Sequence, residues 1–347
     1  MSDSEKLDIK LPQFGEIIRT KKSNYQTIRL LGKGGFGAVY EMIRMSDGAA
    51  FAMKCELIGS KKRVLIMDYK VLRGAQSHGS KHFCEIIEKG RFNDRFRFLI
   101  MKMVGSNLWE LRVKQPHQRF TLNTSLKVAE QCLEAIEHLH ETGFLHRDIK
   151  PGNFAIGRVE VNEHHTIFML DFGLCRQFSV GGKDLRLPRI SAPFRGTTRY
   201  ASIAALKHAE QSRKDDVESW LYVVVEWTAG SLPWRKLRVC PSKFCTNVNT
   251  QGTEKREILQ WKEEVRSGKA LDDFFKNCPK KEFSAIMKYI DSLEYYSIPD
   301  YNHIYYCIQH AAKANNIAPD EPLDWDPEHK YRSPMTHAKN CSKNEII

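Results

Sequence analysis

Four polar side chains in one short stretch have the types and spacing that phosphoryl transfer requires. Asp148, Lys150 and Asn153 occur in His-Arg-Asp-Ile-Lys-Pro-Gly-Asn, and Asp171 follows a short apolar run in Asp-Phe-Gly. Moving a phosphoryl group needs positioned oxygens, metal and compensating charge more than covalent help. Asp148 can take the proton of an incoming hydroxyl, and Lys150 can place a cation beside the transferred group. Asn153 and Asp171 offer the hard oxygen ligands that Mg²⁺ prefers.

The order of these residues makes the interpretation specific. A bare His-Arg-Asp also fits a solvated turn. Here Asp148 and Asn153 must leave one loop toward the same small volume, and the Asp-Phe-Gly that contains Asp171 follows. This ordered set is a catalytic signature. It predicts Mg²⁺ as a cofactor and a hydroxyl group as acceptor.

The surrounding segments resemble the casein kinase 1 group of eukaryotic protein kinases. They are Leu-His-Arg-Asp-Ile-Lys-Pro-Gly-Asn-Phe-Ala at 145–155 and Phe-Arg-Gly-Thr-Thr-Arg-Tyr-Ala-Ser at 194–202. Leu-Pro-Trp-Arg-Lys at 232–236 and Asp-Phe-Gly-Leu-Cys-Arg-Gln at 171–177 are most similar to the tau-tubulin kinase branch.

The resemblance implies an α+β kinase fold of two lobes, with ATP between them, over residues 25–326. The expected N-lobe, about 25–104, is mainly β with one helix, and the expected C-lobe, about 105–326, is α-helical. Residues 1–24 are expected to be a flexible lead-in that packs in part on the first lobe. The polar, basic residues 327–347 are expected to be disordered.

A glycine-rich segment precedes the catalytic stretch. A lone G-x-G-x-x-G also occurs in dinucleotide-binding folds, where its third glycine opens a helix. Here an alternation typical of a strand follows Gly37, and a later strand carries Lys54. In kinases this arrangement covers the ATP phosphates, which the lysine reaches. The resemblance implies nucleotide binding by Gly32, Lys33, Gly34, Gly35, Phe36, Gly37, Val39, Ala52, Lys54, Met101, Lys102 and Val104.

Within that set the roles differ. The resemblance makes Val39 and Ala52 the apolar roof over the base and Met101 the gatekeeper beside the pocket. The backbones of Lys102 and Val104 match the hinge that hydrogen-bonds adenine.

One position departs from the kinase pattern. A helix is expected over residues 62–76, and in kinases this helix presents a glutamate to the strand lysine. The matching residue here is Asp68, one methylene shorter. We expect Lys54 to pair with Asp68, with the helix leaning inward to close the gap.

The segment 171–202 carries two further features. Thr197 matches the residue that fixes the catalytic Asp and Lys in serine/threonine kinases. Lys150, two residues after Asp148, also follows the serine/threonine pattern and not the tyrosine pattern. The usual Ala-Pro-Glu ending is replaced by Ser-Ile-Ala at 202–204.

Composition limits the partners. The 347-residue chain is 41% hydrophobic and has no apolar run near the roughly 20 residues that span a bilayer. It begins without a signal-peptide profile, and its nine scattered cysteines favour a reducing compartment. We expect a monomer in the cytoplasm, with the nucleus as a second compartment, and no membrane partner.

The net charge of +12 attracts polyanions. The basic residues form no single long run, so no specific nucleic acid is expected. In the resembled family the position of Arg199 helps form an anion site, and Lys236 comes soon after it. Acidic or phosphorylated protein substrates are therefore expected, against the alternative of a solvated basic face.

Two other functions fit the same sequence. The first is a weakly active pseudokinase that binds or scaffolds, and the second is a polyanion-binding protein that reuses the fold. Phosphate transfer to a protein distinguishes an active kinase from both.

Overall fold

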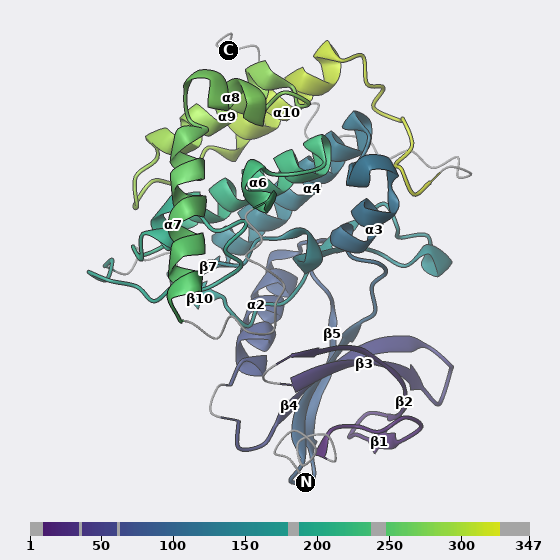
Figure 1. Ribbon diagram of the computed structural model, residues 1–347. Coiled ribbons are helices and arrows are strands. Elements are labelled where there is room, and N and C mark those ends of the chain that lie inside the picture. The colour runs from purple at the N-terminus through teal and green to yellow at the C-terminus, as the bar shows by residue number, and fades with distance from the viewer. Residues whose placement is uncertain (1–9, 35–36, 61–62, 180–186, 237–247, 327–347) are drawn as a thin grey trace. The chain divides into compact units, whose positions relative to one another are not determined.

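The computed structural model describes residues 10–34, 37–60, 63–179, 187–236 and 248–326 (Figure 1). The chain divides into two compact units, each described by itself. Unit 1 comprises residues 1–105 and 155–175, and unit 2 comprises residues 106–154 and 176–347. Unit 1 thus contains a segment, 155–175, from the middle of the expected C-lobe. Both units together give the α+β protein kinase fold expected from the sequence.

Unit 1 is built on an antiparallel sheet of six strands in the order β1-β2-β3-β4-β6-β5. The strands are β1 (Ile17–Arg19), β2 (Asn24–Gly34), β3 (Gly37–Arg44), β4 (Ala50–Leu57), β5 (Ile86–Phe92) and β6 (Phe96–Lys102). Asp47 and Gly48 turn the chain between β3 and β4, and Gly48 has the positive φ of +71° that such a turn requires.

Some described residues before position 25 belong to this sheet. β1 pairs with β2 in the register Ile18↔Tyr25, and Ile18 is fully buried. Arg95 donates to the backbone oxygen of Leu11 at 2.8 Å and to Oε2 of Glu16 at 3.1 Å. The lead-in does pack on the first lobe, but the predicted boundary at residue 25 is too late, because Leu11 and Ile18 are part of the core.

The helix of unit 1, α2 (Leu65–His78), is fixed to the sheet at its start. Glu56 on β4 is buried, and its Oε2 accepts the N–H of Leu65 at 2.9 Å. A carboxylate at a helix N-terminus satisfies a free N–H and complements the helix dipole. Since Glu56 lies two residues after Lys54 on one strand, this contact places α2 beside that lysine.

Segment 155–175 adds a short hairpin to unit 1. β8 (Phe154–Ile156) pairs with β9 (Ile167–Met169). The N–H of Met169 donates to the backbone oxygen of His82 at 2.8 Å, and Phe172 stacks on Phe83 at 5.7 Å. Asp171 follows directly on this anchored strand.

Unit 2 is helical apart from the paired strands β7 (Phe144–Leu145) and β10 (Arg176–Gln177). Its helices are α3 (Leu108–Lys114), α4 (Leu122–Glu141), α5 (Ile203–Leu206), α6 (Arg213–Ala229), α7 (Val248–Glu264), α8 (Gly268–Phe274), α9 (Lys280–Ser292) and α10 (Tyr301–Ala314) (Figure 1). α6 contacts both α4 and α9 and is buried on all sides, as its apolar sequence predicts. No helix among the described residues is long and apolar enough to cross a membrane.

Candidate active site

Lys54 is the centre of the polar site in unit 1. Its Nζ lies 2.8 Å from Oδ1 of Asp68 and 3.0 Å from Oδ1 of Asp171. Oδ1 of Asp68 also accepts the N–H of Phe172 at 3.0 Å. The shorter acid on α2 therefore reaches both the strand lysine and the Asp-Phe-Gly turn, so the expected pairing of Lys54 with Asp68 is present.

Burial and charge oppose one another in this cluster. Burial alone would lower the pKa of Lys54, but the carboxylates of Asp68 and Asp171 outweigh it and hold that pKa above its ordinary value. Burial also raises the pKa of Asp68, so this carboxylate depends on Lys54 to stay ionised. Asp171, by contrast, is about half exposed, with a side-chain exposure of 55%, and has an unusual positive φ of +59°. Its carboxylate is thus available to a ligand.

Strand register places the other nucleotide-binding candidates of the sheet on one face. Val39 lies opposite Lys54 and Ala52 lies opposite Met101. Residues 52 and 54 point to the same side of β4 because side chains alternate along a strand. Val39, Ala52, Lys54 and Met101 therefore share a face. The N–H of Lys102 donates to the backbone oxygen of Glu85 at 2.9 Å. A hydrogen bond between Lys102 and adenine would therefore use the backbone carbonyl oxygen of Lys102.

The described part of the glycine-rich segment lies at the end of β2 and the start of β3. Gly34 pairs with Gly37, while Gly35 and Phe36 lie outside the described residues. A Cβ at Gly37 would lie 1.8 Å from the backbone oxygen of Cys55, so no other residue fits there without moving the strand. A Cβ at Gly32 or Gly34 would meet open space, which is room that a phosphate chain could use.

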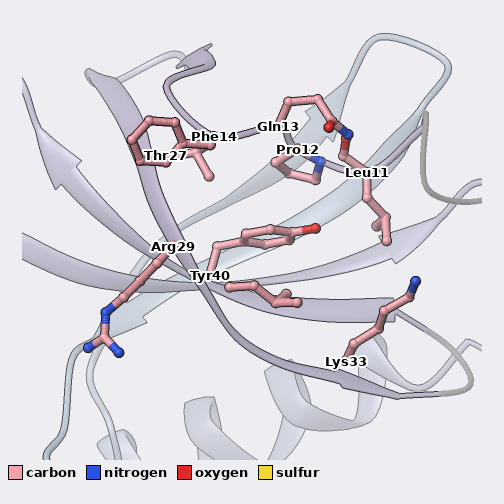
Figure 2. A pocket seen from close by; sticks show the side chains of 9 residues that line it. Leu11, Pro12, Gln13, Phe14, Thr27, Arg29, Lys33 and Tyr40 are labelled. Atoms are coloured by element: carbon pink, nitrogen blue, oxygen red, sulfur yellow. The ribbon is translucent and has the colours of Figure 1, made fainter.

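The side chain of Lys33 does not belong to that face. Lys33 pairs with Ala38, which is a core residue on the opposite side of the sheet. Lys33 lines a hollow of about 330 Å³ together with Tyr40, Arg29 and the segment 11–14. Figure 2 shows these side chains. Lys33 was expected to bind nucleotide; only its backbone can do so in this arrangement.

Asp148 is the centre of the polar site in unit 2. Its Oδ1 accepts from Oγ1 of Thr197 at 2.8 Å, and its Oδ2 accepts from Nζ of Lys150 at 2.6 Å. Nδ2 of Asn153 donates to the backbone oxygen of Asp148 at 2.8 Å. Asp148, Lys150, Asn153 and Thr197, which the sequence places at the catalytic centre, therefore lie together. Each carboxylate oxygen of Asp148 accepts one hydrogen bond.

Buried Asp216 at the start of α6 fixes the backbone beneath Asp148. Its two carboxylate oxygens accept the N–H groups of His146 at 2.7 Å and Arg147 at 2.8 Å. Burial would raise the pKa of Asp216, but the hydrogen bond from His140 and these backbone donors hold it below its ordinary value. Arg147 has a positive φ of +66°, a strained conformation that such anchoring can maintain.

Each unit offers one oxygen ligand of the kind that suits Mg²⁺. Asn153 turns its amide nitrogen toward Asp148, which leaves the amide oxygen for a cation. Asp171 offers an exposed carboxylate, and oxygen ligands of this kind suit magnesium. Asn153 belongs to unit 2 and Asp171 to unit 1, so each was placed by the contacts of its own unit.

The expected anion site is only partly supported. Nη1 of Arg199 lies 3.4 Å from Oε1 of the fully buried Glu226. This carboxylate offsets part of the positive charge of Arg199. Arg189 likewise pairs with Glu210. Arg195 is exposed, and the side chain of Lys236 lies outside the described residues.

Sequence reasoning missed several residues that hold the site. Glu56 starts α2, Glu226 binds Arg199, and Lys262 on α7 lies under the segment after Thr197. Gly196, at φ +100°, has no room for a Cβ, which would lie 2.5 Å from the backbone oxygen of Arg147. Glu56, Glu226 and Lys262 belong to no motif, and their only signal is a polar residue beside apolar ones, whereas Gly196 lies in the segment 194–202 that resembles the casein kinase 1 group.

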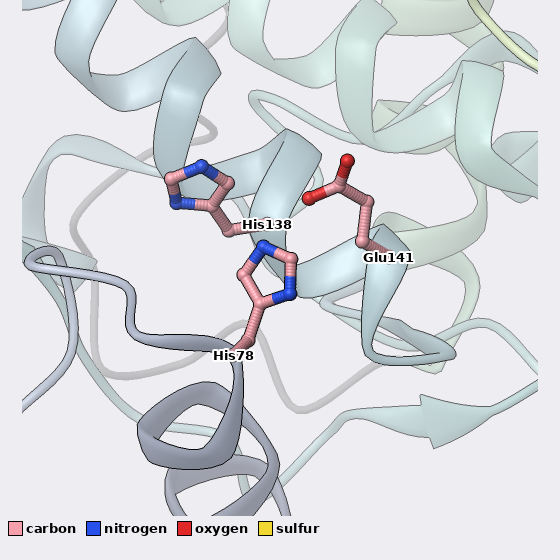
Figure 3. A group of neighbouring side chains, drawn as sticks. All are labelled: His78, His138 and Glu141. Carbon is pink, nitrogen blue, oxygen red and sulfur yellow. The ribbon is translucent and has the colours of Figure 1, made fainter.

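A histidine and a carboxylate also lie together outside this machinery. Figure 3 shows His138 and Glu141 at the end of α4, and His78 at the end of α2. His78 belongs to the other unit. Two exposed or half-exposed ligands from one helix do not make a metal site.

Known proteins resemble the chain over most of its length. A family model described as the protein kinase domain matches residues 25–286. A probable serine/threonine-protein kinase of Dictyostelium discoideum is 32% identical over 88% of this chain and 57% of its own length. The serine/threonine-protein kinase spe-6 of Caenorhabditis elegans is 34% identical over 91% of this chain and 79% of its own.

A third relative, provisionally named a casein kinase I of C. elegans, is 35% identical over 60% of this chain and 61% of its own length. The chain thus spans less than two thirds of two of these three relatives. The extent of the family match, together with the sites around Lys54 and Asp148, shows that this chain belongs to the serine/threonine protein kinase family.

Proposed function

We propose that this chain is an active serine/threonine kinase that transfers the γ-phosphoryl group of Mg-ATP to protein hydroxyls. The observation that carries the proposal is the arrangement around Asp148, where Thr197 and Lys150 each hold one carboxylate oxygen. A carboxylate fixed in this way can orient a substrate hydroxyl and take its proton. Lys150 supplies positive charge next to that point, where charge builds up during transfer.

The cofactors follow from the remaining side chains. When bound, Mg²⁺ neutralises the charge that develops on the transferred phosphoryl group. Asn153 and Asp171 are the residues that would hold it, and Lys54 would contact the nucleotide phosphates. Lys54 is pre-positioned for this by Asp68.

We also propose a casein kinase 1-like subtype, similar to the tau-tubulin kinase branch, acting on acidic or phosphorylated proteins. The segments at 145–155 and 194–202 and the casein kinase I relative support the subtype. The net charge of +12 and the exposed Arg195 support the substrate preference. Because Arg199 shares its charge with Glu226, the preference is expected to need several basic groups acting together.

One comparison tests the activity. The purified protein is incubated with labelled ATP, Mg²⁺ and an acidic serine-containing protein, beside an Asp171→Asn variant of equal thermal stability. Label in the substrate with wild type and almost none with the variant supports the proposal. Nucleotide binding without transfer indicates a pseudokinase, and salt-sensitive nucleic-acid binding without turnover indicates a polyanion-binding protein.

A further inference from the structure

A fully buried lysine lies under the segment that follows Thr197. Lys262 on α7 is 0% exposed. Its Nζ donates to the backbone oxygen of Ala201 and, at 3.4 Å, to that of Thr198. Nε1 of Trp234 donates to the backbone oxygen of Arg199, between them, at 2.9 Å. Three of the four backbone oxygens of residues 198–201 thus accept a hydrogen bond from a side chain outside this segment.

Burying an ammonium group is unfavourable unless something compensates. Here the Nζ of Lys262 lies 4.4 Å from the ring centre of Tyr222 and 5.2 Å from that of Trp234, within cation–π range. The compensation is incomplete, because burial still lowers the pKa of Lys262 to about 7 despite the attraction of Glu218. Both hydrogen bonds of this buried side chain nevertheless go to one short segment. A role in holding that segment explains this arrangement.

The segment also needs an anchor from outside, because it ends in Ser-Ile-Ala and has no terminal acid of its own. α6 supplies two further contacts. Oε1 of Glu218 accepts the N–H of Ile203 at 3.1 Å, and Oε2 of Glu226 accepts from the hydroxyl of Tyr200 at 2.6 Å. Among these anchors, only Lys262 donates to carbonyl oxygens on both sides of Tyr200, those of Thr198 and Ala201.

The anchored turn leads directly to the reacting centre. The backbone oxygen of Thr197 accepts the N–H groups of both Tyr200 and Ala201 at 3.0 Å. Residues 197–201 are therefore one closed turn, and Oγ1 of Thr197 at its start holds Oδ1 of Asp148. A shift of the Ala201 carbonyl would therefore move Thr197, and with it the carboxylate of Asp148.

We propose that Lys262 is a positioning residue for phosphoryl transfer, which fixes the turn 197–201 and, through Thr197, the carboxylate of Asp148. The inference rests on the proposed kinase function. Through Thr197, α7, a helix outside the catalytic motifs, would thus help to orient the carboxylate of Asp148.

The test compares wild type, Lys262→Met and Lys269→Met. Lys269 is an exposed lysine on α8 and serves as the matched control. Leaving buried carbonyl oxygens without their donor is unfavourable, so we expect kcat/KM for a peptide to fall about 10- to 100-fold in Lys262→Met. Nucleotide affinity, measured by calorimetry, should remain unchanged, because the contacts of Lys262 described above all lie in unit 2. The control should match wild type in both respects.

Hydrogen exchange gives a readout that is independent of activity. Backbone amides of Tyr200, Ala201 and Ile203 should exchange faster in Lys262→Met, while amides within α4 stay protected. Unchanged exchange at 200–203 together with unchanged kcat/KM overturns the proposal. If the wild type is inactive, the proposed function fails, yet the exchange result still decides whether Lys262 holds the turn.

A variant that does not fold is also informative. Lys262→Gln is the second variant, since its amide retains a donor with a shorter reach, and its exchange and kinetics should lie between wild type and Lys262→Met. If both variants fail to fold, Lys262 serves the stability of the whole unit and the positioning role is wrong.

Discussion

Asp148 has a neutral donor on one oxygen and a cationic donor on the other. Thr197 fixes Oδ1 and Lys150 fixes Oδ2, while Asp216 holds the loop backbone beneath them. Each of these contacts sets the direction of the carboxylate. The chemistry of the residue therefore depends on neighbours from two other segments of unit 2.

Replacing Asp148 with Asn keeps the shape and the contact to Thr197 but removes the proton acceptor. We expect turnover to fall by about 10²- to 10⁴-fold, the usual contribution of a general base, with nucleotide affinity retained. Steady-state kinetics and calorimetry measure the two quantities. Turnover equal to wild type would remove Asp148 from the mechanism.

Asp68 can be tested in the same way. Asp68→Ala leaves Lys54 with Asp171 alone and leaves the N–H of Phe172 without its acceptor. Removing one member of a buried ion pair typically costs about 3–5 kcal/mol, so both Tm and turnover should fall strongly. Asp68→Glu should retain most of the activity, because the pair is restored. An Asp68→Ala variant as active as wild type would show that this pair is not needed for transfer.

At the scale of elements, α6 and α7 do most of the positioning in unit 2. α6 holds the catalytic loop through Asp216 and the following segment through Glu218 and Glu226. α7 contributes Lys262, whose burial has a consequence for stability that can be measured separately from catalysis.

The stability contributed by α7 should depend on pH. Burial lowers the pKa of Lys262 from 10.5 to about 7, with Glu218 opposing and Arg266 adding to the shift. Between about pH 7 and 10.5 the unfolded chain therefore holds a proton that the folded chain lacks, and stability rises with pH in that window. Lys262→Met lacks this effect. The Tm of wild type minus that of Lys262→Met should increase from pH 7 to pH 9.5, whereas a constant difference would show that Lys262 keeps its ordinary pKa.

Elements with strong patterns could be predicted from the sequence. The helix expected over residues 62–76 is found as α2 (Leu65–His78). The catalytic residues were also predictable, because Asp148, Lys150 and Asn153 lie within six residues of one another. Lys262 and Glu226 were not, since the partners described above lie 26 to 64 residues away in the chain. The sequence also could not show on which face of the sheet the side chain of Lys33 lies, because a motif gives residue order but not strand register.

At the scale of the whole molecule, we propose that charge guides partner choice. Arg199, expected at the anion site, already has an internal carboxylate partner, and so does the nearby Arg189. A net charge of +12 nevertheless produces a field that attracts acidic peptides over a distance. Screening by salt distinguishes this field from short-range contacts.

We expect the KM for an acidic peptide to rise from low salt to about 0.15 M, where the Debye length is about 8 Å. A peptide with uncharged flanks should respond much less and serves as the control. The double variant Arg199→Ala with Lys236→Ala should reduce the difference between the two peptides without lowering turnover on the uncharged one. A peptide array that selects basic flanking residues would contradict the proposed preference.

The strand β1 has a practical consequence for producing the protein. The family match begins at residue 25, a tempting start for a shortened recombinant chain. Such a truncation would remove Ile18 and Leu11 from the core and leave β2 as a bare sheet edge. Exposed edges of this kind template intermolecular pairing, so the shortened chain should collect in inclusion bodies. Expression from residue 10 or earlier should keep it in the soluble fraction of the lysate.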